Sequence, residues 1–208
     1  MAGTGERLEL ASLTNDASSS FASAEQGQAF ETLVAWTRSF LMSERPDLGR
    51  KGTVCPYAST GARIDGLRVG VSLATDEEPE RIRGEMRSAF TAFDAIAHPP
   101  RMGAYRAVMI GYPRMSDGTV LKRAQKSLRL ESLLRRRMIG VFYPDAPERG
   151  LWNKDFRPLR APIPLFAVRA LVPTDAAFVL RHPLLAPAFF LRFPIGGSKQ
   201  IMRVLRRG

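Results

Sequence analysis

Cysteine is almost absent from this sequence of 208 residues, and the single thiol, Cys55, excludes several classes of protein. One cysteine can form neither an intramolecular disulfide nor a cysteine-rich zinc site. Histidine is also scarce, because the chain has only His98 and His182, and neither lies in a zinc-binding HExxH spacing. No stretch approaches the roughly 18 consecutive apolar residues that indicate a transmembrane helix. We therefore expect no membrane span and no histidine-based metal cage.

The N-terminus lacks the features of a secretory signal. Glu6, Glu9 and Asp16 are spread among small residues, without a basic end or an apolar stretch, so we expect a cytoplasmic protein. Lysine is rare: only five of the 31 basic residues are lysine, against 20 acidic residues, and the net charge is +11. A basic balance favours anionic partners such as nucleic acid, acidic membranes, phosphates or carboxylates. No helix-turn-helix, zinc-finger or RNP pattern accompanies the charge.

Composition and apolar spacing predict one domain with two extensions. Residues 1–25 are rich in Ala, Ser, Gly and Thr, which predicts a disordered leader. Residues 26–195 are expected to form a single globular domain, and residues 196–208 a basic tail. The domain begins with an amphipathic helix at 26–42, where apolar residues recur at intervals of three and four.

Strand and helix patterns then alternate along the chain. Period-two alternation predicts a strand within 63–74, and nearly continuous apolar runs predict strands at 105–112, 138–143 and 165–172. Helices are predicted between the first three strands, from Asp76 to about residue 98 and over 119–137, and short helices after Thr174. A proline-rich irregular stretch covers 146–164. The order β-α-β-α-β-loop-β predicts an α+β or α/β fold with a single sheet of about four strands, partly parallel and flanked by helices.

Cys55 is the first candidate for chemistry. It lies between the cations Arg50 and Lys51 and the rigid residue Pro56, a setting that favours a thiolate and fixes its backbone. Such a thiolate serves as a nucleophile or as the axial ligand of a haem iron. The alternative is a small buried hydrophobe at a strand entrance. His98 and His182 each precede a proline; each is a candidate haem or metal ligand or base, or simply a helix-end residue.

The loop 150–164 combines a backbone stiffened by prolines with aromatic, amide and charged side chains, as loops that line a site often do. Trp152, Asn153 and Phe156 are candidates for a substrate pocket. Arg157 and Arg160 are candidates for binding haem propionates or a substrate carboxylate through paired N–H groups. The alternative is a structural lid, with the aromatic side chains covering the sheet end and the arginines solvated.

The basic helix 119–137 ends in Arg135, Arg136 and Arg137 and supports a different hypothesis. Its cations form either a solvated face or, with the tail 199–207, the contact surface of a non-catalytic protein that binds nucleic acid or another anionic partner. A homodimer is compatible with either hypothesis.

Three blocks of the sequence resemble a family of small bacterial proteins known as the domain of unknown function DUF6875. They are residues 49–57 (GRKGTVCPY), 138–144 (MIGVFYP) and the long block 151–169 (LWNKDFRPLRAPIPLFAVR). The resemblance spans about residues 30–193 and implies a family without an activity.

The order of motifs is similar, more distantly, to that of the YqcI/YcgG family. Members of that family include haem-dependent enzymes that oxidise nitrogen on amino acids or related amines in specialised metabolism. This chain has Cys55 before Pro56 where that family has proline before cysteine, and of its later pattern only Pro187-Ala188-Phe189 is matched. The resemblance implies a haem-dependent oxygenase with a small-molecule substrate. Cys55 would be the axial ligand, with His182 and His98 as the next candidates.

Overall fold

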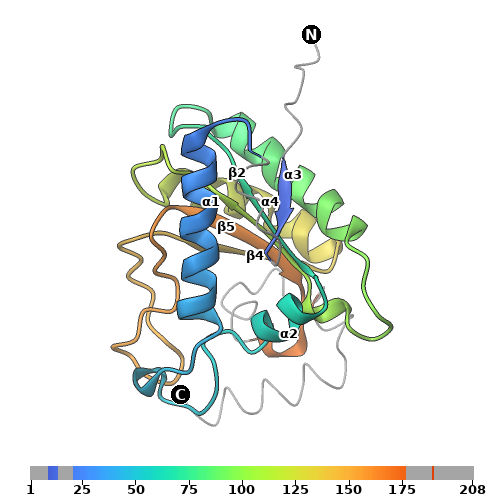
Figure 1. Ribbon diagram of the computed structural model, residues 1–208, viewed down its shortest axis with the longest axis vertical. Coiled ribbons are helices and arrows are strands. Elements are labelled where there is room, and N and C mark those ends of the chain that lie inside the picture. The colour runs from blue at the N-terminus through green and yellow to red at the C-terminus, as the bar shows by residue number, and fades with distance from the viewer. Residues whose placement is uncertain (1–8, 14–20, 177–188, 190–208) are drawn as a thin grey trace.

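One mixed β-sheet organises the computed structural model, which describes residues 9–13, 21–176 and 189 (Figure 1). The strands are β1 (Leu10–Ser12), β2 (Leu67–Val71), β3 (Ala107–Gly111), β4 (Arg137–Phe142) and β5 (Leu165–Ala170). They lie in the order β1-β2-β3-β5-β4. β2 and β3 are parallel, whereas β1 is antiparallel to β2, and β5 is antiparallel to both β3 and β4. The fold is therefore α+β, as expected, with five strands rather than about four.

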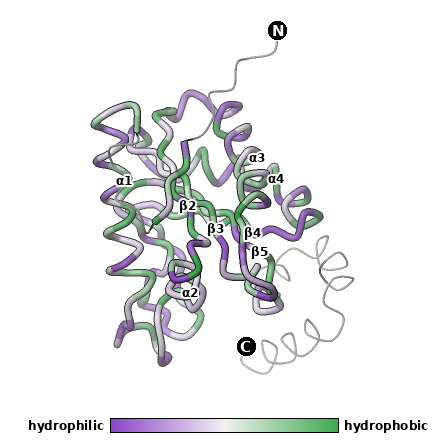
Figure 2. Tube along the Cα trace, turned by 45° about the vertical axis from the view of Figure 1, so that its right-hand side comes forward, coloured by the Kyte–Doolittle hydropathy of each residue, from purple (hydrophilic) through white to green (hydrophobic). Residues whose placement is uncertain are grey.

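Two helices connect the strands that run in one direction. α3 (Pro79–Ala95) joins β2 to β3, and α4 (Thr119–Leu134) joins β3 to β4. The two connections, from β2 to β3 and from β3 to β4, progress across the sheet in the same direction. Right-handed crossovers of this kind place both helices on the same face of the sheet, which is to its right in Figure 2. The core on this face includes Phe90, Leu121, Ile110, Val141 and Phe166, all buried.

The opposite face of the sheet is covered by α1 (Ala24–Trp36), which a π-helical turn, η2 (Thr37–Leu41), extends. Ser23 caps the start of α1, because its side chain accepts a hydrogen bond from the backbone N–H of Gln26 at 3.2 Å. Phe30 and Leu33 of α1 pack in a second core with residues of β2, β3 and β5. Figure 1 shows the loop between β4 and β5 running beside α1.

The apolar residues expected to be buried in the predicted strands are buried. Ile110, Ile139, Val141, Phe166 and Val168 pack in the core under α3 and α4, and Val69, Val71 and Met109 pack in the core under α1. The prediction that these residues belong to the core of the sheet is therefore confirmed.

The N-terminal segment differs from the expected disordered leader. Residues Leu10–Ser12 form β1 against β2, and Leu13 and Phe21 are buried, with 2% and 9% of their surface exposed. Three paired residues are too few to show a period, which is why the pattern was invisible in the sequence. α2 (Ala58–Arg63) was also not expected, because its six residues have no apolar stripe. The predicted basic tail, 196–208, lies outside the described residues.

Candidate functional site

Cys55 lies at the base of a loop that starts at the end of η2. Its backbone N–H donates to the carbonyl of Leu41 at 2.8 Å, and Val54 donates to Ser43 at 3.2 Å. The Arg50 guanidinium donates to the carbonyls of Thr53 and Val54, at 2.9 and 3.1 Å. The half-buried Cys55 is therefore held in place by main-chain hydrogen bonds, and Arg50 braces its own loop rather than the thiol.

α2 begins directly after the Cys55-Pro56 pair and brings Tyr57 to the short helix η4 (Gly103–Tyr105). The rings of Tyr57 and Tyr105 are 5.7 Å apart. Gly61 of α2 allows this packing, because a Cβ there would lie 2.3 Å from the Tyr105 carbonyl oxygen. The carbonyl of Cys55 accepts hydrogen bonds from Ala58 N–H at 3.3 Å and from the Thr53 hydroxyl at 3.0 Å.

Arg169, near the end of β5, is the cation that interacts electrostatically with Cys55. Because β5 runs opposite to β2, β3 and β4, its carboxyl end lies where those strands begin, next to α2 and η4. Arg169 makes a two-point ion pair with Asp175, at 2.8 and 2.5 Å, and Asp175 is 2% exposed. A third hydrogen bond, from the Val172 N–H at 2.9 Å, holds Asp175.

Opposing effects act on the pKa of Arg169. Burial lowers this pKa, but the hydrogen bonds and charge of Asp175, together with the charges of Cys55 and Tyr57, more than offset burial and leave it above its ordinary value. Cys55 and Tyr57 are thus close enough to the guanidinium to interact with it electrostatically. We call Cys55, Tyr57, Tyr105, Arg169 and Asp175 the Cys55 cluster.

Sequence patterns did not single out Tyr57, Tyr105, Arg169 or Asp175 as functional. One signal was available: Arg169 is a charged residue inside the apolar run of β5 (LFAVRALV). A charge at such a position is stable only with a partner, which here is Asp175.

The aromatic and amide residues of the loop 150–157 pack against the far end of the Cys55 loop. Asn153 donates to the Asp47 carbonyl at 2.7 Å, and Trp152 and Asn153 lie directly against Gly49. Phe156 is buried and stacks on Phe40 with 5.9 Å between ring centres. Asn153 and Phe156 therefore hold the loop 150–157 in contact with the segment that precedes Cys55, whereas Trp152 remains half exposed.

Arg157 and Arg160 brace the same loop from within. Arg157 donates through Nη1 to the Lys154 carbonyl at 2.7 Å, and Arg160 donates through Nε to the Ala146 carbonyl at 3.5 Å. Their other guanidinium nitrogens have no hydrogen-bond partner among the described residues.

The histidines do not join the Cys55 cluster in the described part of the chain. His98 is exposed, its Nδ1 lies 2.9 Å from the Pro99 carbonyl, and its ring lies against Gly103. His182 lies outside the described residues. Within residues 9–13, 21–176 and 189, no three His, Cys, Asp or Glu side chains come together in a way that could hold a metal ion.

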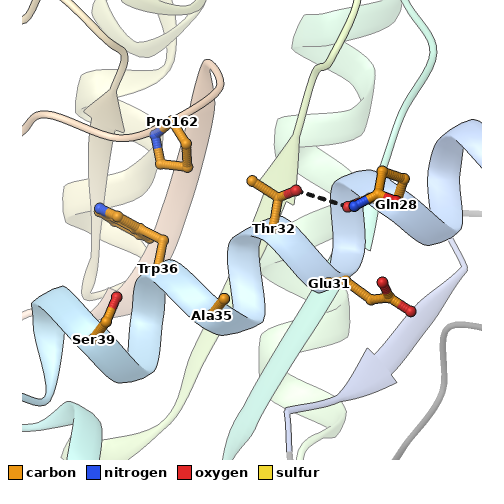
Figure 3. Close-up of a pocket in the computed structure, with 7 residues that line it drawn as sticks. All are labelled: Gln28, Glu31, Thr32, Ala35, Trp36, Ser39 and Pro162. Carbon is orange, nitrogen blue, oxygen red and sulfur yellow. Dashed lines mark hydrogen bonds between the residues drawn. The ribbon is translucent and has the colours of Figure 1, made fainter.

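A separate groove, of about 490 Å³, follows the outer face of α1 (Figure 3). Trp36 and Pro162 face each other across it, and the rest of its lining consists of Gln28, Glu31, Thr32 and Ala35 of α1 and Ser39 of η2. The Thr32 hydroxyl donates a hydrogen bond to the Gln28 backbone carbonyl at 2.8 Å, so this hydroxyl already has a partner within the helix. The proline-rich loop therefore lines a groove through Pro162, and not through the residues expected to form a pocket.

On α4, several cations have acidic partners. Lys122 lies 2.6 Å from Glu148 and 2.7 Å from the Tyr143 hydroxyl, Arg135 pairs with Glu131 at 3.3 Å, and Arg137, which follows the helix, pairs with Asp94. In the described part of the chain, Lys126, Arg129 and Arg136 have no such partner. No described helix is both long and apolar enough to cross a membrane.

The sequence blocks 49–57, 138–144 and 151–169 meet in space. Gly49 contacts Trp152, and Tyr143 exchanges backbone hydrogen bonds with Leu159 and Ala161 at 3.1 and 3.3 Å. Arg169 interacts electrostatically with Cys55. The protein is therefore of the α+β class: it has one mixed sheet flanked by helices, and the three sequence blocks contact one another.

The chain belongs to the DUF6875 family, a domain of unknown function, whose model matches residues 30–203 and so includes all three blocks. No curated protein and no solved structure matches the chain.

Proposed function

We propose that this protein is an enzyme whose active centre is the Cys55 thiolate, which ligates haem iron for the oxidation of a small amine or amino acid. The observation that carries the proposal is the setting of Cys55: a half-buried thiol on a fixed backbone, within electrostatic range of Arg169, which is paired with Asp175. The thiolate is the form of cysteine that binds metals. The substrate class comes from the resemblance to the YqcI/YcgG family.

The donor chemistry of the cluster suits a single axial ligand. Cys55 is the only cysteine of the chain, and a thiolate is a soft ligand that haem iron accepts. Two hydrogen bonds to the Cys55 carbonyl and one from its N–H keep this residue from shifting. Bound haem would supply the oxygen chemistry, as the cofactor does in haem enzymes generally.

The other residues of the chain have binding and positioning roles in this proposal. Asp175 holds Arg169 in place, so the cation stays within electrostatic range of Cys55. The ring pair of Tyr57 and Tyr105 would offer an aromatic surface to a bound ligand. Arg157 and Arg160 each keep guanidinium N–H groups for a carboxylate of haem or substrate.

The test is a titration of the purified full chain with haemin, followed by ultraviolet–visible spectroscopy. We expect a Soret band in the wild type that Cys55→Ser abolishes or shifts, because a hydroxyl is a harder and weaker ligand for this iron. Circular dichroism should show that Cys55→Ser keeps the fold. His98→Ala and His182→Ala are the matched controls and should retain the wild-type band.

Two results would overturn the proposal. Haemin that produces no specific band with the wild type would exclude haem as the cofactor. A band lost in His182→Ala or His98→Ala but unchanged in Cys55→Ser would transfer the axial position to that histidine.

A further inference from the structure

Two leucines on the outer face of α4 are exposed to solvent although the rest of the helix packs well. Leu130 and Leu134 have 56% and 69% of their surface exposed, and they lie one helical turn apart. On the opposite side of α4, Leu121, Ala124 and Leu128 are buried in the core. The exposed leucines therefore contribute nothing to the core, which makes them candidates for contact with another surface.

Cations without acidic partners surround this pair. Lys126 and Arg136 are exposed and Arg129 is half buried, and none of them pairs with a described carboxylate. The nearest acid on the helix, Glu131, is already bound by Arg87 at 2.9 Å and by Arg135 at 3.3 Å. Asp117 lies at the other end of α4, near Lys122 and Arg123. We call Lys126, Arg129, Leu130, Leu134 and Arg136 the α4 face.

We propose that the α4 face docks the protein on an anionic lipid surface. A helix face that combines leucines with unpaired cations suits the boundary of a bilayer, where the apolar groups enter the headgroup region and the cations meet lipid phosphates. The net charge of +11 adds a general attraction of the same sign. This docking is independent of haem binding at Cys55.

Two other partners fit the α4 face less well. A second copy of the chain would bring Lys126, Arg129 and Arg136 of both copies together, and the like charges would repel. Nucleic acid would satisfy the cations, but phosphate contacts make no use of two exposed leucines. The apolar pair at the centre of the basic face thus favours lipid.

The experiment is flotation of the full chain with vesicles of phosphatidylcholine alone or mixed with phosphatidylglycerol. We expect binding to the mixed vesicles that weakens as salt is raised. Lys126→Gln/Arg129→Gln should weaken it by about fivefold for each cation removed. Leu130→Asn/Leu134→Asn should weaken it by about tenfold or more, because two apolar contacts are lost.

The matched control is Leu151→Asn/Lys154→Gln, which removes an exposed leucine (53% exposed) and an exposed lysine from the loop 150–157. It should bind vesicles as the wild type does, and thermal melting should show that all variants are folded.

Several results would overturn the proposal. The first is that the wild type fails to bind the mixed vesicles; the second is that Leu130→Asn/Leu134→Asn binds them as strongly as the wild type does. Self-association that the leucine variant abolishes would identify a second copy as the partner. Duplex DNA bound by the wild type and the leucine variant alike, but lost in the charge variant, would identify nucleic acid.

Discussion

Arg136 occupies a backbone position that ordinarily belongs to glycine. It lies two residues beyond α4, which ends at Leu134, and its φ of 61° is in the left-handed region. Its N–H donates to the Leu133 carbonyl at 2.9 Å and so closes the end of the helix. A residue with a Cβ costs about 1–2 kcal/mol in this conformation, so Arg136 lowers the stability of the fold relative to a residue that adopts the conformation freely.

Arg136→Gly is therefore expected to stabilise the fold by about 0.5–1 kcal/mol, because glycine adopts this conformation freely but loses more entropy on folding. Urea denaturation measures the change. Arg135→Gly is the control: Arg135 has a φ of −75°, and glycine there should lower stability. An Arg136→Gly variant that is less stable than the wild type would show that the arginine side chain stabilises the fold.

The sequence identified Cys55 as the centre of the candidate site but not its surroundings. Local features, a lone cysteine followed by proline, were enough to select this residue. Arg169 and Tyr105 reach it only through the sheet topology, which places the end of β5 beside the start of β3. Spacing along the chain contains no such information. For the same reason, the cations expected near the thiol were Arg50 and Lys51, whereas Arg50 bonds to carbonyls of its own loop and Arg169 interacts electrostatically with Cys55.

At the scale of elements, apolar periodicity predicted α1, α3, α4 and the four strands from β2 to β5, because each buries a face against a layer of the core. β1 and α2 were missed. Both are short and depend on few neighbours: β1 pairs with β2, and α2 packs on η4 and β2. A short element that is stabilised by residues distant in the sequence shows little apolar periodicity of its own.

The contact between α2 and η4 yields a prediction with an internal control. Gly61→Ala should destabilise the protein by about 1–3 kcal/mol, since the new Cβ would lie 2.3 Å from the Tyr105 carbonyl oxygen and would force α2 away from η4. Gly84→Ala, in α3, meets nothing within 4 Å and should stabilise the protein by about 0.5–1 kcal/mol. Thermal or urea unfolding of both variants tests this. Equal effects would show that α2 does not pack tightly on η4.

At the scale of the whole molecule, a buried polar network ties β2, α3 and β3 together. The carboxylate of Glu85 in α3 accepts hydrogen bonds from Ser72, just after β2, at 2.8 Å and from Tyr112, just after β3, at 2.7 Å. Arg81 adds a third at 3.1 Å. Burial, and then the charge and hydrogen bond of Glu85, raise the pKa of Tyr112 well above its ordinary value.

This raised pKa predicts a loss of stability at high pH. Above about pH 10 the unfolded chain releases the tyrosine proton while the folded chain retains it, so stability falls with pH by up to about 1.4 kcal/mol per unit. Below that pH the contribution is fully present. Tyr112→Phe should cost about 1–3 kcal/mol at pH 8, because Glu85 loses a partner, and should show a shallower decline from pH 10 to 11. Urea denaturation at these pH values measures both, and parallel declines would contradict the assignment to Tyr112.

The position of β5 has a consequence for how the chain is made. β5 lies between β3 and β4, although it follows both in the sequence, and it supplies Phe166 and Val168 to the core under α3 and α4. Until residues 165–170 leave the ribosome, β4 has no neighbour with which to pair, and β3 has β2 alone. The nascent chain therefore exposes an unpaired strand and an open apolar face from the time β4 emerges until β5 follows it. The sheet is complete only when β5 inserts between β3 and β4. A chain that terminates before β5 leaves the backbone N–H and C=O groups of β4 without a strand to pair with.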